Sequence, residues 1–282
     1  MRTFVHGAAV WGVESPRRPS RVDGVTMAGF HVRDLQALRI VPHPAVTLLL
    51  DFGAGSPVID GARGRQQLGS VVAGPGLGSA GAVLARGENV ECVQVRLSPL
   101  VAGAMLGTSP AELDGVVVSL DDLWGRAASR IREQLGEVSA WQDRFALTDA
   151  LLARRQAAGP PVDPEVAWAW HRIVAGHGLA RIDELAAEVG WSRKRLWSRF
   201  RSQIGLPPKR AAKLVRFDHA AHRLVAGEGA ARVAADAGYA DQSHLHRDVL
   251  EFTGATPAAV AREPFLAVDD IAWPGVRPAP GR

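Results

Sequence analysis

The sequence predicts a multidomain protein in which an N-terminal α+β domain is followed by an all-α module with two helix-turn-helix units. In the first half of the chain, short Val- and Leu-rich runs bounded by Gly and Pro precede two amphipathic helices. In the C-terminal third, residues 186–191 (AAEVGW) recur 48 positions later as residues 234–239 (AADAGY). A short apolar helix, a Gly turn and a second helix, present twice, are typical of paired helix-turn-helix units.

The composition indicates a folded protein with room for about two domains. Of the 282 residues, 47% are hydrophobic and 22% are charged. The single cysteine, Cys92, excludes an internal disulfide framework and is consistent with a reducing compartment. The longest apolar runs are far too short to span a bilayer, so we expect a cytoplasmic protein with no membrane partner.

Residues 1–158 are expected to form the α+β domain. Strands are predicted over residues 46–52, 70–73 and 90–97, which are rich in Val and Leu. Apolar residues at helical spacing then predict one helix from Ser119 to Gly136 and another from about residue 140 to residue 158.

A proline-rich linker, residues 159–164 (GPPVDP), separates the two parts because consecutive prolines cannot continue a helix. Asp163 is the expected N-cap of a helix that runs to about Ala175. The helical module then covers residues 165–262. The tail, residues 263–282, is rich in Pro and Gly and is expected to be ordered only in part.

In the first helix-turn-helix unit, Gly190 permits the turn and Ser192 is the expected N-cap of the second helix. Leu196 and Phe200 are predicted to point inward, which leaves a polar face outside. Such a face fits the major groove, where Arg and Lys pair with guanine edges or hold phosphate. The candidate DNA-binding residues are Ser192, Arg193, Lys194, Trp197, Ser198 and Arg201. For Trp197, packing against a neighbouring helix is an equal alternative.

In the second unit, Leu245 and Val249 are predicted to anchor the second helix. Its outward residues suit base edges but bring little charge. These candidates are Gln242, Ser243, His246 and Arg247. A helix over residues 208–226 would span roughly 28 Å. That length suits two recognition helices in successive major grooves, about 34 Å apart.

Positive charge is concentrated on the first unit and the segment after it. Residues 190–223 contain ten basic residues and one acidic residue, a net charge of +9. Residues 227–262 contain three basic and five acidic residues, a net charge of −2. A basic stripe of this kind is the electrostatic pattern expected of a phosphate-binding surface, and it predicts DNA binding that weakens steeply with salt.

The C-terminal part of the chain resembles the AraC/XylS family of bacterial transcription regulators. The resemblance covers about residues 165–262 and is carried by Leu185-Ala186, Gly190-Trp191-Ser192, Leu196, Arg199-Phe200, Gly205, Pro208, Arg216, Leu224, Val233-Ala234, Gly238-Tyr239, Asp241-Gln242-Ser243, Leu245, Arg247, Gly254 and Thr256-Pro257. It implies a seven-helix DNA-binding module whose two recognition helices read adjacent major-groove segments. Family members usually carry a separate domain for effector sensing or dimerisation, and residues 1–158 are expected to supply it.

One departure from the family concerns the second recognition helix. The family usually continues after its Arg with an aromatic and then a basic residue, whereas residues 248–251 (DVLE) follow Arg247 here. We therefore expect the first unit to supply most of the affinity and the second to modulate sequence choice.

The sequence thus predicts a sequence-specific DNA-binding transcription regulator and not an enzyme. The expected partners are double-stranded DNA, a small-molecule effector at the N-terminal domain, RNA polymerase and a second copy of the chain in a homodimer. Two alternatives stay open. One is a DNA-repair or base-modifying enzyme that uses the same module, for which Cys92 is the one candidate nucleophile. The other is an interaction protein that acts through its N-terminal helices.

Other patterns carry no site. Residues 76–81 (GLGSAG) match a nucleotide-binding fingerprint, but Gly87 interrupts the helix it requires, so a glycine-rich turn is expected. His6, His31 and His43 lack the close spacing of metal ligands. His219 and His222 share a face of the basic helix and are expected near phosphate or solvent. We therefore expect no catalytic, cofactor or metal site.

Overall fold

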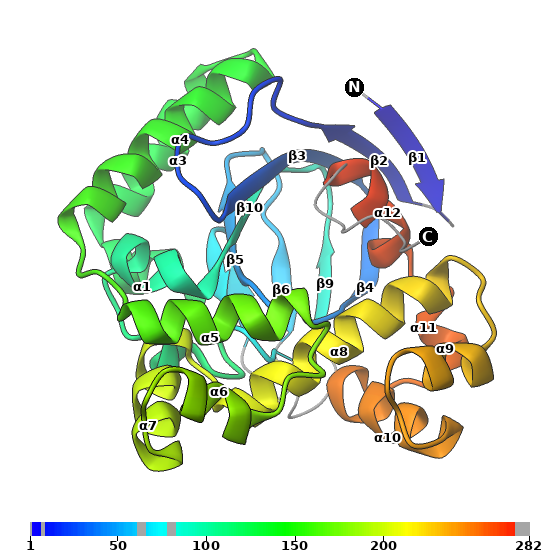
Figure 1. Cartoon of the computed structure of the whole chain (residues 1–282). Helices are drawn as coiled ribbons and strands as arrows, with labels where there is room; N and C mark the ends of the chain where they lie inside the picture. Colours follow the sequence, from blue (N-terminus) through cyan, green and yellow to red (C-terminus); the bar gives the residue numbers. More distant parts are fainter. Residues whose placement is uncertain (1, 7–8, 61–65, 78–82, 274–282) are drawn as a thin grey trace.

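The computed structural model describes all residues except 1, 7–8, 61–65, 78–82 and 274–282. The sheets lie in the N-terminal half of the chain and the C-terminal half is helical (Figure 1). This is the predicted order of an α+β domain followed by an all-α module, and the predicted fold class is confirmed. The fingerprint-like segment falls largely in residues 78–82, outside the described residues.

The larger sheet has seven strands in the order β1-β2-β3-β10-β5-β8-β11. Its strands are β1 (Arg2–His6), β2 (Ala9–Glu14), β3 (Val25–Arg33), β5 (Val46–Asp51), β8 (Val71–Ala73), β10 (Val90–Leu97) and β11 (Val117–Ser119). The central strand β10 pairs antiparallel with β3 on one edge and β5 on the other. Because apolar layers cover both of its faces, β10 is buried at six of its eight positions.

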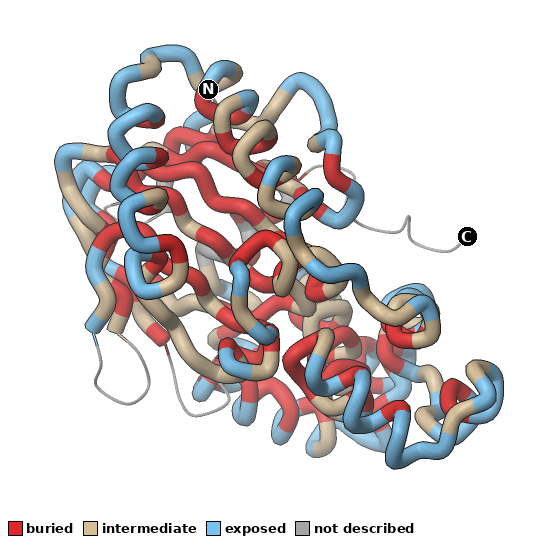
Figure 2. The backbone as a smooth tube through the Cα atoms, turned by 90° about the vertical axis from the view of Figure 1, so that its left-hand side faces the viewer, coloured by how far each residue is buried: buried red, intermediate tan, exposed pale blue. Residues whose placement is uncertain are grey.

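The smaller sheet has four strands in the order β4-β9-β6-β7. They are β4 (Leu35–Ile40), β6 (Val58–Asp60), β7 (Gln66–Leu68) and β9 (Val83–Gly87). One core lies between the sheets and contains Trp11, Phe30 and Ile59. A second core lies on the opposite face of the larger sheet, where Leu48 and Val95 pack against the helices. Figure 2 shows this burial along the strands and the inner sides of the helices.

Apart from β11, the strands precede the helices of the N-terminal domain, as predicted. These helices are α1 (Pro99–Leu106), the short 3₁₀ helix η1 (Pro110–Leu113), α2 (Leu120–Trp124), α3 (Arg126–Glu137) and α4 (Trp141–Ala158). The prediction of one helix from Ser119 to Gly136 is wrong in one respect, because the helix is interrupted at Gly125. Gly125 has a φ of +53°, which no α-helix accepts, so α2 and α3 are separate.

Seven helices follow between residues 164 and 260 in this part of the described chain, the number that the family resemblance implies. They are α5 (Pro164–Ala175), α6 (Ile182–Glu188), α7 (Arg193–Ile204), α8 (Pro208–Val225), α9 (Ala230–Asp236), α10 (Gln242–Thr253) and α11 (Pro257–Val260). One core holds them together and includes Leu196, Phe200, Phe217 and Leu245, each 0% exposed.

The first part of the tail forms a further helix, α12 (Pro264–Ala272), which the sequence pattern did not indicate. This helix leaves the helical module and packs on strands β1 to β4 of the N-terminal domain (Figure 1). Trp273 lies 5.8 Å from Phe30, measured between ring centroids, and the guanidinium of Arg96 lies 3.6 Å from the Trp273 ring. Burial of Val268 and Trp273 explains why this segment is ordered despite its flanking prolines.

Candidate nucleic-acid interface

The first helix-turn-helix unit consists of α6 and α7. The turn passes through Gly190, whose φ of +67° is accessible to glycine and costly for other residues. Ser192 caps α7, since its side chain accepts a hydrogen bond from the backbone nitrogen of Arg195 at 3.2 Å. Leu196 and Phe200 are fully buried, as predicted.

The outer face of α7 is exposed at every position that the sequence singled out. Ser192, Arg193, Lys194, Trp197, Ser198 and Arg201 all face solvent. Trp197 is 48% exposed, which argues against the packing alternative. The guanidinium of Arg201 lies 5.5 Å from the centroid of the Trp197 ring, so the indole and the cation form one continuous surface.

The second unit consists of α9 and α10, joined by a turn at Gly238, which has a φ of +70°. Asp241 caps α10 by accepting a hydrogen bond from the backbone nitrogen of His244 at 2.7 Å. Leu245 and Val249 are buried, as predicted. The four predicted reading residues, Gln242, Ser243, His246 and Arg247, are all exposed.

The two units stand at opposite ends of α8. With 18 residues, α8 is about 27 Å long. Figure 1 shows α7 and α10 along the same edge of the molecule, away from the sheets. This placement is consistent with two recognition helices that face one side of a DNA duplex.

Much of the predicted basic stripe is paired with carboxylates of the same chain, which the net charge of +9 did not reveal. The ion pairs are Arg193–Asp183, Arg199–Asp163, Arg210–Asp114, Lys213–Asp248, Lys213–Glu251, Arg216–Asp248, Arg223–Glu228 and Arg223–Asp236. Within the described part of the chain, Lys194, Arg195, Arg201 and Lys209 have no such partner. Three of these four cations lie on α7, so the positive charge that remains available is centred on the first unit.

Asp248, which departs from the family pattern, has a structural role. It is 3% exposed and receives Arg216 at 3.0 Å and Lys213 at 3.1 Å. Both cations belong to α8, so Asp248 fastens α10 to the spacer helix. Sequence reasoning missed this role because the partners lie more than 30 positions away.

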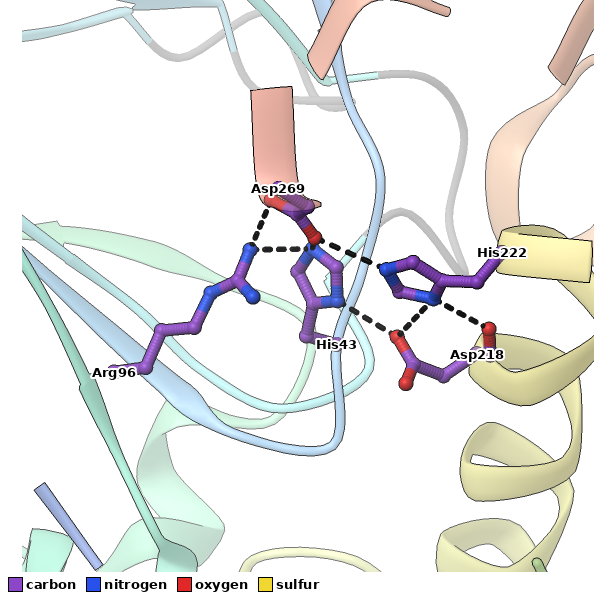
Figure 3. A network of polar contacts seen from close by, with 5 residues as sticks. All are labelled: His43, Arg96, Asp218, His222 and Asp269. Carbon is purple, nitrogen blue, oxygen red and sulfur yellow. Dashed lines mark hydrogen bonds and ion pairs between the residues drawn. The ribbon is translucent and has the colours of Figure 1, made fainter. Parts of the chain in front are cut away.

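Of the two histidines of α8, His222 contradicts the prediction, because it lies in a largely buried network and not near solvent. His219 stacks on His177 with the ring centroids 4.3 Å apart. His222 lies in a polar network at the junction of the domains, together with His43 and Asp269 (Figure 3). Burial lowers the pKa of His222, but the carboxylates of Asp218 and Asp269 outweigh that effect and raise it to about 9.

A cavity of about 90 Å³ lies between the two sheets of the N-terminal domain. Its lining is almost entirely apolar and includes Trp11, Phe30, Leu38 and Ile59. His43 supplies one of its few polar groups. The cavity therefore touches the junction network at one end.

The fold and the exposed faces define a protein of the helix-turn-helix DNA-binding class. Residues 185–263 match the family model described as a helix-turn-helix domain. The match lies within the part of the chain that resembles the AraC/XylS regulators, and it confirms a helix-turn-helix domain there. No curated protein matches the chain. No described helix is long and apolar enough to cross a membrane.

Three solved structures illustrate the resemblance in shape. ToxT from Vibrio cholerae O395 has a TM-score of 0.49 at 9% identity and covers 86% of this chain and 99% of its own. The C-terminal domain of AraT, a response regulator from Geobacillus stearothermophilus, has a TM-score of 0.34 at 18% identity over 36% and 86% of the two chains. The AraC-like transcriptional activator CuxR has a TM-score of 0.29 at 15% identity over 67% and 79%. At such scores none of them carries a functional argument.

Proposed function

We propose that this protein is a sequence-specific transcription regulator in which α7 supplies most of the DNA affinity and α10 selects the sequence. The observation that carries the proposal is the difference between the two exposed faces. The face of α7 offers Lys194, Arg195 and Arg201 without ion-pair partners among the described residues, and these suit phosphate and guanine. The face of α10 offers mainly amide, hydroxyl and imidazole groups, which suit base edges.

We propose no catalytic role for the chain. Cys92, the one cysteine, lies on the central strand β10 and is 4% exposed. Burial raises the pKa of its thiol, so the reactive thiolate is disfavoured at neutral pH. This environment argues against the DNA-modifying alternative.

The N-terminal domain is proposed to bind a small apolar effector between its sheets. Aromatic and aliphatic side chains line the cavity, and apolar cavities of this kind take apolar guests. At about 90 Å³ it admits only a small molecule unless the sheets separate. We also propose that the chain acts as a homodimer, which sedimentation of the purified protein tests directly.

The test of DNA recognition begins with selection of bound genomic fragments by the purified full chain. Affinity for the selected site is then measured at several salt concentrations for three variants. These are Lys194→Ala with Arg201→Ala, Arg247→Ala, and a control that removes two exposed charges of α3, Arg126→Ala with Arg130→Ala.

The α7 variant is expected to weaken binding to all sequences and to lower the salt slope by about 2, because two side chains no longer neutralise phosphates. Arg247→Ala is expected to relax discrimination at one position by about 1–3 kcal/mol. The control should match the wild type. Failure to select any discrete site would refute sequence-specific recognition. A larger affinity loss for Arg247→Ala than for the α7 pair would reverse the assignment of the two helices.

A further inference from the structure

Five polar side chains meet in a largely buried cluster where the two domains and the C-terminal helix touch (Figure 3). They come from four separate segments: His43 follows β4, Arg96 lies on β10, Asp218 and His222 lie on α8, and Asp269 lies on α12. His43 is 7% exposed and Asp269 is 4% exposed. The cluster lies apart from the exposed faces of α7 and α10.

Asp218 orients both imidazole rings of the cluster. Nδ1 of His43 donates to its carboxylate oxygen Oδ1 at 2.7 Å, and Nδ1 of His222 donates to its backbone oxygen at 2.8 Å. Each ring therefore turns its other nitrogen, Nε2, toward the same point. Histidines that bind metals are typically held in this way, with the second ring nitrogen donated to a carboxylate or a backbone carbonyl.

The point on which both rings converge is Oδ2 of Asp269. This oxygen lies 3.3 Å from Nε2 of His43 and 3.2 Å from Nε2 of His222. In a tetrahedral zinc site with bonds of 2.0–2.1 Å, neighbouring ligand atoms lie about 3.4 Å apart. One ligand atom from each of the three residues lies within 4.8 Å of the other two, so a modest approach of the rings completes the set.

The charges of the cluster allow a cation to take the place of a proton. At neutral pH the raised pKa of His222 keeps one proton in the cluster, which balances the two carboxylates together with the guanidinium of Arg96. A metal ion at the imidazole nitrogens would displace that proton, and its own charge would then offset the remaining net charge of −1. Arg96 holds the other oxygen of Asp269, Oδ1, at 2.6 Å and so leaves Oδ2 for a further partner. Arg96 also lies 2.9 Å from Nε2 of His43, and a cation at that nitrogen would replace this contact while the bond to Oδ1 remains.

We propose that His43, His222 and Asp269 bind one divalent transition-metal ion of the zinc type. Two imidazoles and one carboxylate favour Zn²⁺, Co²⁺ or Ni²⁺ over Ca²⁺ and Mg²⁺, which prefer all-oxygen sites. The ion would join the N-terminal domain, α8 and α12 at a single point. Three protein ligands leave a fourth position for water or a ligand.

The principal competitor is a proton, because protonation of one imidazole also compensates the negative charge. The experiment must therefore detect the metal itself. The full-length protein is treated with a chelator, dialysed, and titrated with Zn²⁺ at neutral pH by calorimetry, with metal analysis of the dialysed complex. We expect one Zn²⁺ per chain and a melting temperature that rises with Zn²⁺ concentration.

Variants locate the site. His222→Gln and Asp269→Asn are expected to abolish stoichiometric binding, and Asp218→Ala to weaken it about 10–100-fold through loss of ring orientation. His219→Gln is the matched control, because His219 lies on the same helix but stacks on His177 outside the cluster. It should bind Zn²⁺ like the wild type.

Absence of stoichiometric binding by the wild type would overturn the proposal, and so would equal binding by the wild type, His222→Gln and Asp269→Asn. Circular dichroism identifies any variant that fails to fold. In that case Co²⁺ bound to the wild type decides, because a four-coordinate site absorbs visible light strongly and a hexa-aqua ion does so only weakly. A weak spectrum would refute the assignment.

Discussion

Replacement of Asp248 by Asn tests whether this buried carboxylate holds the second recognition helix in place. The substitution keeps the shape of the side chain and removes its charge. Arg216 donates to Asp248 at 3.0 Å, and the ammonium group of Lys213 lies 3.1 Å from its other oxygen. Loss of one partner of a fully buried ion pair costs about 3–5 kcal/mol.

The cost at Asp248 should be smaller than that upper range. The side chains of Arg216 and Lys213 are 17% and 26% exposed, so water stabilises part of their charge. Lys213 also keeps a second partner, Glu251, at 2.6 Å. We therefore expect Asp248→Asn to reduce the free energy of unfolding by about 2–3 kcal/mol.

The assay is urea unfolding of the full chain combined with hydrogen exchange of the α9 and α10 amides. Glu251→Gln is the matched control, because it removes a carboxylate from the same cluster that is 50% exposed, and it should cost less than about 1 kcal/mol. In Asp248→Asn the amides of α10 should exchange faster while those of α7 stay protected. Equal losses of stability in the two variants would refute the structural role of Asp248.

Three further predictions follow from local geometry. In urea unfolding, Gly205→Ala should destabilise the protein more than Gly190→Ala. Both residues have a positive φ, but at Gly205 a Cβ would lie 2.6 Å from a backbone oxygen of η1, whereas at Gly190 it would meet open space. Equal effects would contradict the contact between α7 and η1. Leu245→Ala should lower the free energy of unfolding by about 2–5 kcal/mol, because Leu245 is fully buried. Leu250 is half-exposed, so Leu250→Ala should lower it by less than about 0.5 kcal/mol. Similar losses would show that α10 is not anchored by its inner face. Asp163→Asn should lose a small stabilisation at neutral pH, because hydrogen bonds from an arginine of α7 lower the pKa of this carboxyl. This stabilisation is present above the pKa that Asp163 has in the unfolded chain, and it is lost as the pH falls through the lower pKa of the folded protein. The unfolding curves of the variant and the wild type should therefore converge below about pH 4. A constant difference between them would argue against the ion pair.

The parts of the structure that the sequence predicts are those specified by local pattern. The turn at Gly190, the cap at Ser192 and the inward positions of Leu196 and Phe200 all follow from helical periodicity and capping preferences. The ten candidate DNA contacts are likewise exposed because they occupy the faces opposite the buried residues. Their contact with DNA remains a prediction.

The parts that the sequence does not predict depend on docking between distant segments. His43 meets Asp218 across 175 positions, and His222 meets Asp269 across 47. No sequence spacing predicts these contacts. The path of the chain through loops and sheets sets the distance between the residues, whereas the helical period relates only residues within one helix. The net charge of residues 190–223 overestimates the unpaired positive charge for the same reason. Other elements supply the acidic partners, as α10 supplies Asp248 to Arg216.

The spacer helix α8 is the element through which these findings connect. In the middle of α8, Lys213 and Arg216 hold α10 through Asp248, and further toward its C-terminal end Asp218 and His222 hold the junction cluster. A helix of about 27 Å that is hydrogen-bonded throughout moves largely as one body. A cation that tightens the cluster, or a guest that moves the wall of the neighbouring cavity, therefore acts on the element that also sets the position of α10. Under the proposed function, α8 is the element that connects the N-terminal domain with the two helices proposed to contact DNA.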